Sequence, residues 1–149
     1  MPDDLWNNPR RLPQVDAFVN LLMAHRQVTD GFFELFKEHG LTEPRYDVLR
    51  ILRNAGPEGL PSQEIGRRLY TRVPDVTRLV DGLVKLELVE RERCPEDRRR
   101  VWVRVTRKGL QLLRKLDKPV LDIHRKQFPS LSSRQLETLS KLLLSVAKS

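Results

Sequence analysis

The chain has 149 residues, enough for one domain with a hydrophobic core but short for two independent domains. Its formal net charge of +8 attracts polyanions such as nucleic acid, anionic lipid or an acidic protein, although a basic surface can also serve solubility alone. Aromatic residues make up only 6% of the chain, so the core is expected to consist mainly of leucine and valine.

Cysteine content and the N-terminus bear on the compartment. Cys94 is the single cysteine, which excludes an intrachain disulfide and fits a reducing, cytoplasmic setting. The N-terminus, Met-Pro-Asp-Asp-Leu-Trp, carries acids where a signal peptide is basic, and no apolar run approaches the roughly 18 residues of a membrane span. We therefore expect a soluble, cytoplasmic protein without a membrane partner.

The first third of the chain is predicted to be mostly helical. Residues 1–13 contain three prolines and predict an irregular arm. Residues 15–36 place apolar side chains at helical spacing, which predicts one long helix closed by Gly40. A second helix is expected from Thr42, a good N-cap residue, to about residue 54.

Two shorter helices are predicted next. Pro61 is expected to open the first and Pro74 the second, because a proline at the first helical position loses no hydrogen bond. The second of them has an apolar stripe, and these residues face away from it: Asp75, Arg78, Asp81, Gly82 and Lys85.

The pattern then becomes strand-like. Residues 88–93 and 100–106 are predicted strands joined by a turn at residues 95–97. The stretch from Arg91 to Lys108 holds eight basic and three acidic residues, so it carries 8 − 3 = +5 of the chain's net charge of +8. The basic residues are Arg91, Arg93, Arg98, Arg99, Arg100, Arg104, Arg107 and Lys108. Their concentration favours nucleic acid over a solubilising surface, because arginine is weakly hydrated and enters a narrow minor groove readily.

The C-terminal part is predicted to be helical again. Thr106 is a natural N-cap for a long helix, which Pro119 should bend or break. Ser132 and Gln135 form a predicted capping box that begins the last helix.

The order of these elements predicts a single, mainly α domain with a small β-hairpin over residues 1–149. Residues 41–109, in which short helices precede the hairpin, have the order of a winged helix-turn-helix DNA-binding region. Residues 14–40 and 110–149 keep apolar stripes that the small central region cannot cover, and they predict a helical dimerisation region.

DNA recognition requires a helix that fits the major groove, positive charge for phosphates and side chains at base edges. The helix that begins at Pro74 presents Arg78, and arginine is the commonest reader of guanine; Gly82 keeps that face low enough for a DNA backbone to approach. Taken alone, such a helix is more often an ordinary amphipathic surface helix, and the basic hairpin shifts the interpretation to DNA binding. The candidate DNA-binding residues here are Arg72, Asp75, Thr77 and Arg78.

In the hairpin, the candidate DNA-binding residues are the three consecutive arginines Arg98, Arg99 and Arg100. Asp97 is expected to pair with a neighbouring arginine and thereby to brace the wing, although the alternative is a surface ion pair of little energetic value.

Several segments together carry a resemblance to a known family. They are the residues 41–52 around Tyr46, VTRLVDGL at residues 76–83, LVER at 88–91, PEDRR at 95–99 and VTRKG at 105–109. In this order and at these intervals they resemble the multiple-antibiotic-resistance regulator (MarR) family of winged-helix transcription factors.

The resemblance implies a transcription regulator, a repressor, that binds a pseudo-palindromic operator in double-stranded DNA as a homodimer. It implies that Arg78 and its neighbours occupy the major groove, and that Arg99, braced by Asp97, lies at the minor groove. Ser62 and Gln63 would lie near phosphates. Many members are released from DNA by small, often phenolic or anionic, ligands, so such an effector is a further implied partner.

Three positions depart from the family's pattern, of which Val105 in place of leucine is a minor one. Glu87 stands where glycine usually follows the recognition helix, and Tyr70 also replaces a common glycine. The turn after the recognition helix therefore lacks the residue that adopts positive φ most easily.

Two other function classes compete with DNA binding. A winged-helix module that docks an acidic protein partner would use the same basic hairpin. An enzyme finds no support, because the chain has no Gly-rich phosphate loop and no nucleophile–base pattern. No catalytic residue and no cofactor are expected, the scattered histidines predict no metal site, and Cys94 is expected to be an inert thiol.

Overall fold

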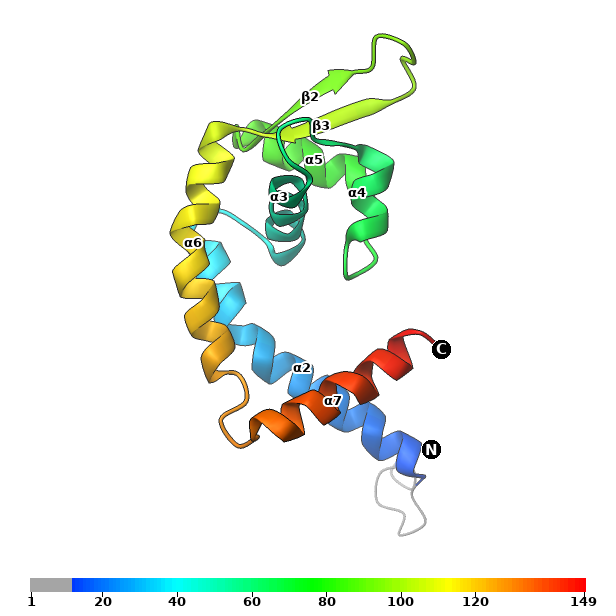
Figure 1. The fold of residues 1–149 in the computed structure, drawn as a ribbon, viewed down its shortest axis with the longest axis vertical. Helices are drawn as coiled ribbons and strands as arrows, with labels where there is room; N and C mark the ends of the chain where they lie inside the picture. The colour runs from blue at the N-terminus through cyan, green and yellow to red at the C-terminus, as the bar shows by residue number, and fades with distance from the viewer. Residues whose placement is uncertain (1–11) are drawn as a thin grey trace, which may run out of the picture. The chain divides into compact units, whose positions relative to one another are not determined.

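The computed structural model describes residues 12–149. In chain order its elements are α2 (Pro13–Glu38), α3 (Glu43–Ala55), β1 (Leu60–Pro61), α4 (Ser62–Arg68), α5 (Val76–Lys85), β2 (Val89–Arg93), β3 (Val101–Val105), α6 (Arg107–Lys126) and α7 (Ser133–Ala147) (Figure 1). The predicted fold class, mainly α with a small β-hairpin, is confirmed. The predicted arm at residues 1–13 lies almost wholly outside the described residues.

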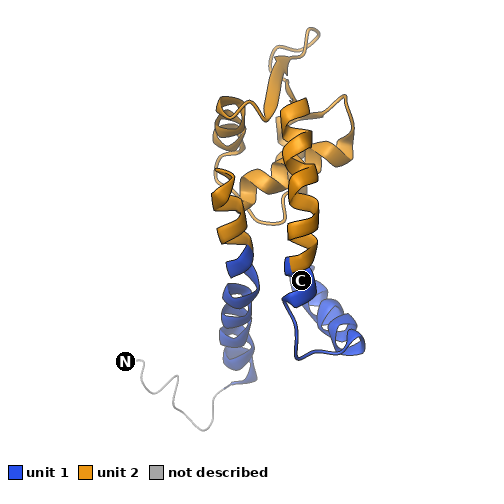
Figure 2. Ribbon diagram, turned by 90° about the vertical axis from the view of Figure 1, so that its left-hand side faces the viewer, with its two compact units in different colours: residues 1–31, 123–149 blue, residues 32–122 orange. Residues whose placement is uncertain are grey.

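The chain divides into two compact units (Figure 2). Unit 1 consists of residues 1–31 and 123–149, and unit 2 of residues 32–122. The predicted division into a winged region at residues 41–109 and flanking dimerisation helices is based on expected function, whereas the two units are defined by the compactness of the chain. The predicted division therefore stays a prediction.

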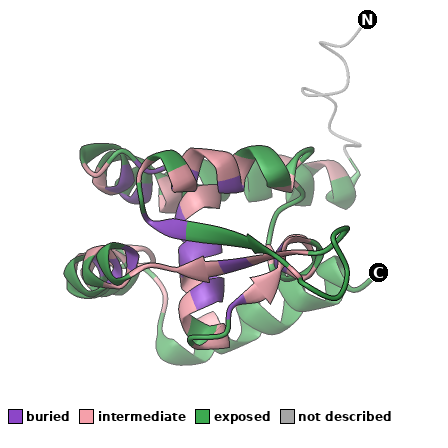
Figure 3. Cartoon of the chain, turned by 90° about the horizontal axis from the view of Figure 1, so that it is seen from above, coloured by how far each residue is buried: buried purple, intermediate pink, exposed green. Residues whose placement is uncertain are grey.

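The hydrophobic core belongs to unit 2. Among the described residues, every buried apolar side chain lies between Phe32 and Leu116, and leucine and valine predominate as predicted. Figure 3 shows the buried residues concentrated on α3, beneath the strands. The aromatic part of the core is a stack in which the rings of Phe36 and Tyr46 have centroids 4.5 Å apart. Unit 2 is thus the part of the chain with a core of its own.

The capping residues predicted from the sequence act as caps. The Thr42 side chain accepts a hydrogen bond from the backbone N–H of Arg45 at 3.4 Å, and Ser132 forms the full capping box with Gln135. Thr106 accepts from the backbone N–H of Gly109 at 3.1 Å at the start of α6. These short side chains satisfy N–H groups that have no partner inside their helices.

Three details of the helices differ from the predictions. Of the bend or break expected at Pro119, the break is wrong, since α6 runs through that residue for 20 residues in all. Helix α5 begins at Val76 rather than at Pro74, because Asp75 is the N-cap and accepts from the Arg78 backbone N–H at 3.1 Å. Pro61 is likewise the N-cap of α4 and not its first helical residue.

The hairpin is part of a three-stranded antiparallel sheet in the order β1-β3-β2. The sequence predicted β2 and β3, and the structure adds β1, in which Leu60 lies opposite Val103. Gly59, with φ +75°, makes this pairing sterically feasible, because a Cβ there would collide with the carbonyl oxygen of Val103. A strand of two residues is too short to give an alternating pattern, so the sequence could not reveal it.

The turn from α5 into β2 is built on Glu87, whose φ is +60°. Its backbone N–H donates to the carbonyl of Val84 at 2.9 Å, and that of Leu88 donates to Leu83 at 3.0 Å. These two bonds define a Schellman motif, in which Leu83 and Leu88 are both buried and Glu87 takes the place that glycine usually fills. Glu87 is the one residue other than glycine with positive φ in the described part of the chain.

Glu87→Gly should stabilise the protein against urea by roughly 0.5–1 kcal/mol. A left-handed conformation costs an L-residue roughly 1–2 kcal/mol, and glycine avoids this cost. Part of the gain is lost because glycine has more conformational freedom in the unfolded chain and therefore loses more entropy on folding. Glu87→Ala is the matched control, because alanine keeps the steric cost and loses the carboxylate. If the glycine variant proves no more stable than the alanine variant at equal protein concentration, the strain assigned to Glu87 is absent.

Candidate nucleic-acid interface

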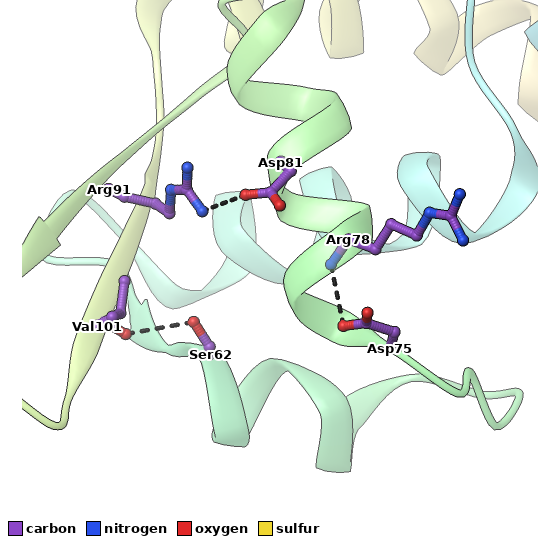
Figure 4. A network of polar contacts seen from close by, with 6 residues as sticks. All are labelled: Ser62, Asp75, Arg78, Asp81, Arg91 and Val101. Carbon is purple, nitrogen blue, oxygen red and sulfur yellow. Dashed lines mark hydrogen bonds and ion pairs between the residues drawn. The ribbon is translucent and has the colours of Figure 1, made fainter.

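Helix α5 has one face in the core and one in solvent. Val80 and Leu83 are buried and anchor it, while Thr77 and Arg78 are exposed on the outer side. Figure 4 shows the Arg78 side chain extended from the helix, away from Asp81. No residue among those described forms an ion pair with the Arg78 guanidinium, so its donors are available to a base edge or a phosphate.

Asp75, also a predicted contact, has a structural task. Its carboxylate accepts the backbone N–H of Arg78 and caps the helix, as drawn in Figure 4. A negative charge at this end is favourable to the helix dipole and leaves one carboxylate oxygen for a further donor such as the amino group of cytosine.

The expectation that Gly82 leaves room for a DNA backbone is wrong. The space above Gly82 is occupied by the guanidinium of Arg45 from α3, which would lie 2.5 Å from a Cβ at residue 82. Arg45 also donates to the carbonyl of Gly40 at 3.5 Å. The missing side chain of Gly82 therefore admits a neighbouring helix's arginine and brings α3 and α5 close together.

The basic residues of the hairpin fall into two groups. Three of the eight are paired with acids: Arg91 with Asp81, Arg104 with Glu92 and Glu90, and Lys108 with Glu87. The other five form no ion pair with any residue that the structure describes, and all are exposed: Arg93, Arg98, Arg99, Arg100 and Arg107. The unneutralised charge is thus concentrated at the wing loop and at the two ends of the hairpin's strands.

Asp97 holds the wing loop through the backbone rather than through a guanidinium. Its carboxylate accepts the N–H of Arg99 at 3.0 Å, and its carbonyl accepts the N–H of Arg100 at 3.0 Å. The Cys94 N–H closes the loop onto the Arg100 carbonyl at 2.9 Å. A short aspartate side chain reaches the N–H two residues on, so Asp97 sets the loop shape and leaves the arginine side chains unpaired.

The recognition helix and the wing are joined by an ion pair that the sequence did not predict. Asp81 on the outer side of α5 accepts from Arg91 on β2 (Figure 4). Both residues were noted separately, one as polar and one as basic, but their separation of ten residues has no helical or strand periodicity. The pair links the outer face of α5 to β2.

Helix α4 brings two predicted phosphate contacts to the same unit. Ser62 donates to the carbonyl of Val101 at 3.4 Å and so ties α4 to β3, while Gln63 is exposed. Glu64 holds Arg68 at 3.0 Å, and this hydrogen bond is the main cause that lowers the pKa of Glu64. Arg72 is exposed in the connection to α5.

The connection between α4 and α5 is held against α3 by the contact between the Tyr70 ring and the Arg50 guanidinium. The guanidinium of Arg50 lies over the ring of Tyr70, 4.7 Å from its centroid, and Arg50 also lies 3.6 Å from the carboxylate of Asp47. Burial raises the pKa of Asp47, and the nearby Arg50 lowers it to a smaller extent. Tyr70, where the family has glycine, thus provides a ring that covers a partly buried cation.

Within residues 12–149, no three His, Cys, Asp or Glu side chains come together in a way that could hold an ion. The same part of the chain contains no helix that is both long enough and apolar enough to span a bilayer.

The fold and the exposed basic groups define a winged helix-turn-helix protein. The family model described as the MarR family matches residues 39–100. The chain is 33% identical over 96 residues to the HTH-type transcriptional regulator MhqR of Bacillus subtilis, and the match covers 64% of this chain and 65% of MhqR. The match thus spans just under two thirds of that relative's length.

Solved structures extend the likeness over most of the chain. A MarR transcription factor from Planctomyces limnophilus is 37% identical, with 89% of this chain and 95% of that chain covered and a TM-score of 0.72. A mutant of MarR from E. coli, complexed with operator DNA, is 25% identical over 89% and 95% with a TM-score of 0.78. PcaV from Streptomyces coelicolor, in complex with its natural ligand, is 25% identical over 98% and 96% with a TM-score of 0.74. The chain belongs to the MarR family of transcription regulators.

The raised pKa of the Asp47 carboxyl leads to a prediction about how the stability of the protein depends on pH. Its pKa is raised by folding, so the folded protein keeps this proton at pH values where the unfolded chain, with a pKa of about 3.9, has lost it. The stability contributed by Asp47 therefore falls as pH rises through the folded pKa. Asp47→Asn removes this loss, so the stability of the variant relative to wild type should increase from about pH 3.5 to pH 7. Urea unfolding at several pH values measures the difference, and a constant or decreasing difference would contradict the assignment.

Proposed function

We propose that this protein is a sequence-specific transcription regulator, a repressor, that binds a pseudo-palindromic operator in double-stranded DNA as a homodimer. The observation that carries the proposal lies within one compact unit: the exposed Arg78 of α5 and the wing-loop arginines Arg98, Arg99 and Arg100 form no ion pair with any residue that the structure describes. Both features supply donors for acceptor groups of DNA that the protein itself leaves unused.

In the proposed complex α5 lies in the major groove. Arg78 contacts a base edge, Thr77 and Arg72 contact neighbouring bases or phosphates, and Asp75 offers its remaining oxygen to a base amino group. The wing reaches the adjacent minor groove with Arg99, flanked by Arg98 and Arg100, because arginine is favoured where that groove is narrow. Ser62 and Gln63 at the start of α4 contact the phosphate backbone.

The apolar surface of unit 1 supports the proposed homodimer. None of the residues of α7, all of which the structure describes, is buried. Large apolar side chains of unit 1 are exposed: Leu12, Phe18, Leu21, Leu22, Met23, Leu142, Leu143, Leu144 and Val146. Surfaces of this kind mark association sites, and a two-fold dimer covers the same patch on both copies. Two winged units related by such an axis would bind half-sites roughly 10–10.5 base pairs apart.

A small phenolic or anionic effector is part of the proposal. It is supported by the relative PcaV, whose structure is in complex with a natural ligand. A regulator of this kind acts in the compartment that holds the DNA, which supports a cytoplasmic location. An acidic protein partner is the competing interpretation, and it would leave the protein without preference for any DNA sequence.

Arg78→Ala should weaken binding to the operator by about 1–3 kcal/mol if Arg78 contacts a guanine with two donors. The measurement is a gel-shift titration with the DNA that flanks the protein's own gene. The preference for operator over unrelated duplex should fall with it. Lys118→Ala, which removes an exposed positive charge from α6, is the matched control and should keep that preference. Equal operator affinity of Arg78→Ala and wild type would refute the base contact.

Arg99→Ala should weaken binding to all duplexes and flatten the salt dependence. Each phosphate neutralised contributes about 0.9 to the slope of log K against log salt concentration, so the loss from both copies in a dimer is up to roughly 2. Fluorescence anisotropy at several salt concentrations gives the slope. An unchanged slope means that Arg99 does not neutralise phosphate charge.

A further inference from the structure

Helix α5 has a close contact that involves a glycine near each of its ends. Near its start, Val76 packs against Gly66 of α4, where an added Cβ would lie 3.0 Å from a methyl group of Val76. In its last turn, Gly82 is covered by the guanidinium of Arg45 from α3. The first contact is apolar, whereas the second depends on a long, charged side chain. Arg45 therefore links α3 to the last turn of α5 through a polar group.

The Arg45 guanidinium contacts two backbone segments with different nitrogens. Its Nη1 donates to the carbonyl of Gly40, just beyond the end of α2, at 3.5 Å. Its Nη2, Cζ and Nε lie 2.5, 2.9 and 3.0 Å from the position that a Cβ of residue 82 would take. The edge that carries Nη2 and Nε thus lies over Gly82 while Nη1 serves Gly40. A planar fork of donors can do both, and a lysine ammonium cannot.

The charge of Arg45 lies where two helices end. Gly40 follows the last turn of α2, and Gly82 belongs to the last turn of α5. The C-terminal end of a helix carries partial negative charge, so a cation is favourable at both places. Among the described residues the Arg45 guanidinium has the Gly40 carbonyl as its hydrogen-bond acceptor and forms no ion pair with an acid. Its charge is therefore available to these two helix ends.

We propose that Arg45 is a positioning residue for the recognition helix: it holds the last turn of α5 against α3 and the end of α2, and it does not touch DNA. The inference rests on the proposed function, in which α5 lies in the major groove. Arg78 is four residues before Gly82 and therefore lies on the same side of α5. A shift of this end of the helix moves the Arg78 guanidinium, and two hydrogen bonds to one base tolerate little displacement.

Arg45→Ala should weaken operator binding at least fivefold and leave binding to unrelated duplex within twofold of wild type. Fluorescence anisotropy with the DNA that flanks the protein's own gene measures both. Arg45→Lys should lose as much operator affinity, because lysine keeps the charge but not the planar fork. The slope of log K against log salt concentration should change by less than the contribution of one phosphate, about 0.9. Operator affinity retained by Arg45→Lys, or a smaller slope in Arg45→Ala, would identify a phosphate contact and overturn the proposal.

Gly82→Ala tests the same contact from the side of α5. Its Cβ displaces the guanidinium, so operator affinity should fall at least fivefold, yet the midpoint of urea unfolding should not fall because alanine is the better helix former. The double variant with Arg45→Ala should lose no more than the weaker single variant, since both remove one contact. Gly31→Ala is the matched control, because its Cβ would meet Ile123 at an ordinary 3.4 Å, and it should keep operator affinity. Losses that multiply in the double variant, or affinity that simply follows the unfolding midpoint, would overturn the proposal.

Hydrogen–deuterium exchange tests the positioning without DNA. Arg45→Ala should raise the exchange rates of the backbone amides of residues 82–88 at least threefold, because the end of α5 loses its contact with α3. Arg78→Ala, which removes an exposed arginine from the same side of α5, should leave these rates unchanged. Equal rates in Arg45→Ala and wild type would overturn the proposal. If wild type shows no preference for the operator over unrelated duplex, the proposed function fails, and the exchange rates still decide whether Arg45 positions α5.

Discussion

The joint between α5 and β2 is the constraint on which the winged unit depends. At this joint the backbone N–H of Leu88 donates to the carbonyl of Leu83, and both leucine side chains are buried. This bond sets the direction in which the chain leaves α5. The Thr106 hydroxyl donates to the Glu87 carbonyl at 2.7 Å and ties the start of α6 to the same turn. Arg91 on β2 also forms an ion pair with Asp81 on α5. The helix, the wing and the helix that leaves it are therefore fixed at a single point.

The distribution of charge follows from this arrangement. Basic residues near the base of the hairpin are neutralised, since Arg91 and Arg104 each have an acid within reach. Arginines in the wing loop have none among the described residues, because Asp97, the acid beside them, uses its carboxylate to hold the loop backbone. Ion pairs at the base of the hairpin help to define the shape of the hairpin, whereas the arginines of the wing loop keep their charge available for a polyanion. A hairpin with basic residues alone would have the charge but would lack these shape-defining ion pairs.

Unit 1 and unit 2 differ in how their apolar side chains are covered. Unit 2 contains all the buried apolar side chains of the described residues, which lie between Phe32 and Leu116. Unit 1 has helical surfaces with exposed leucines, and α7 buries none of its residues. Helices with an uncovered apolar face are stabilised by association, and this is the physical reason for proposing a homodimer.

The sequence predicted features that depend on neighbours a few residues apart. Helical periodicity and the caps at Thr42 and Ser132 are local, and the helices and both caps are confirmed. The start of α5 was misplaced by two residues because Pro74 and Asp75 are both good helix-starting residues, and the side-chain cap at Asp75 decided between them. The positive φ of Glu87 was anticipated in part, since the position was noted as one where glycine is usual.

By itself, then, the sequence determined the type of each main element, the winged class and the excess of charge in the hairpin, because these follow from periodicity and composition. Only the tertiary structure decided which arginines form no ion pair with a described residue, that Arg45 fills the space over Gly82, and that β1 joins the sheet. These features join residues that are distant in the chain and lack a common period. Their contacts arise from the packing of α3, α5 and the sheet, which sets side-chain distances that no local pattern encodes.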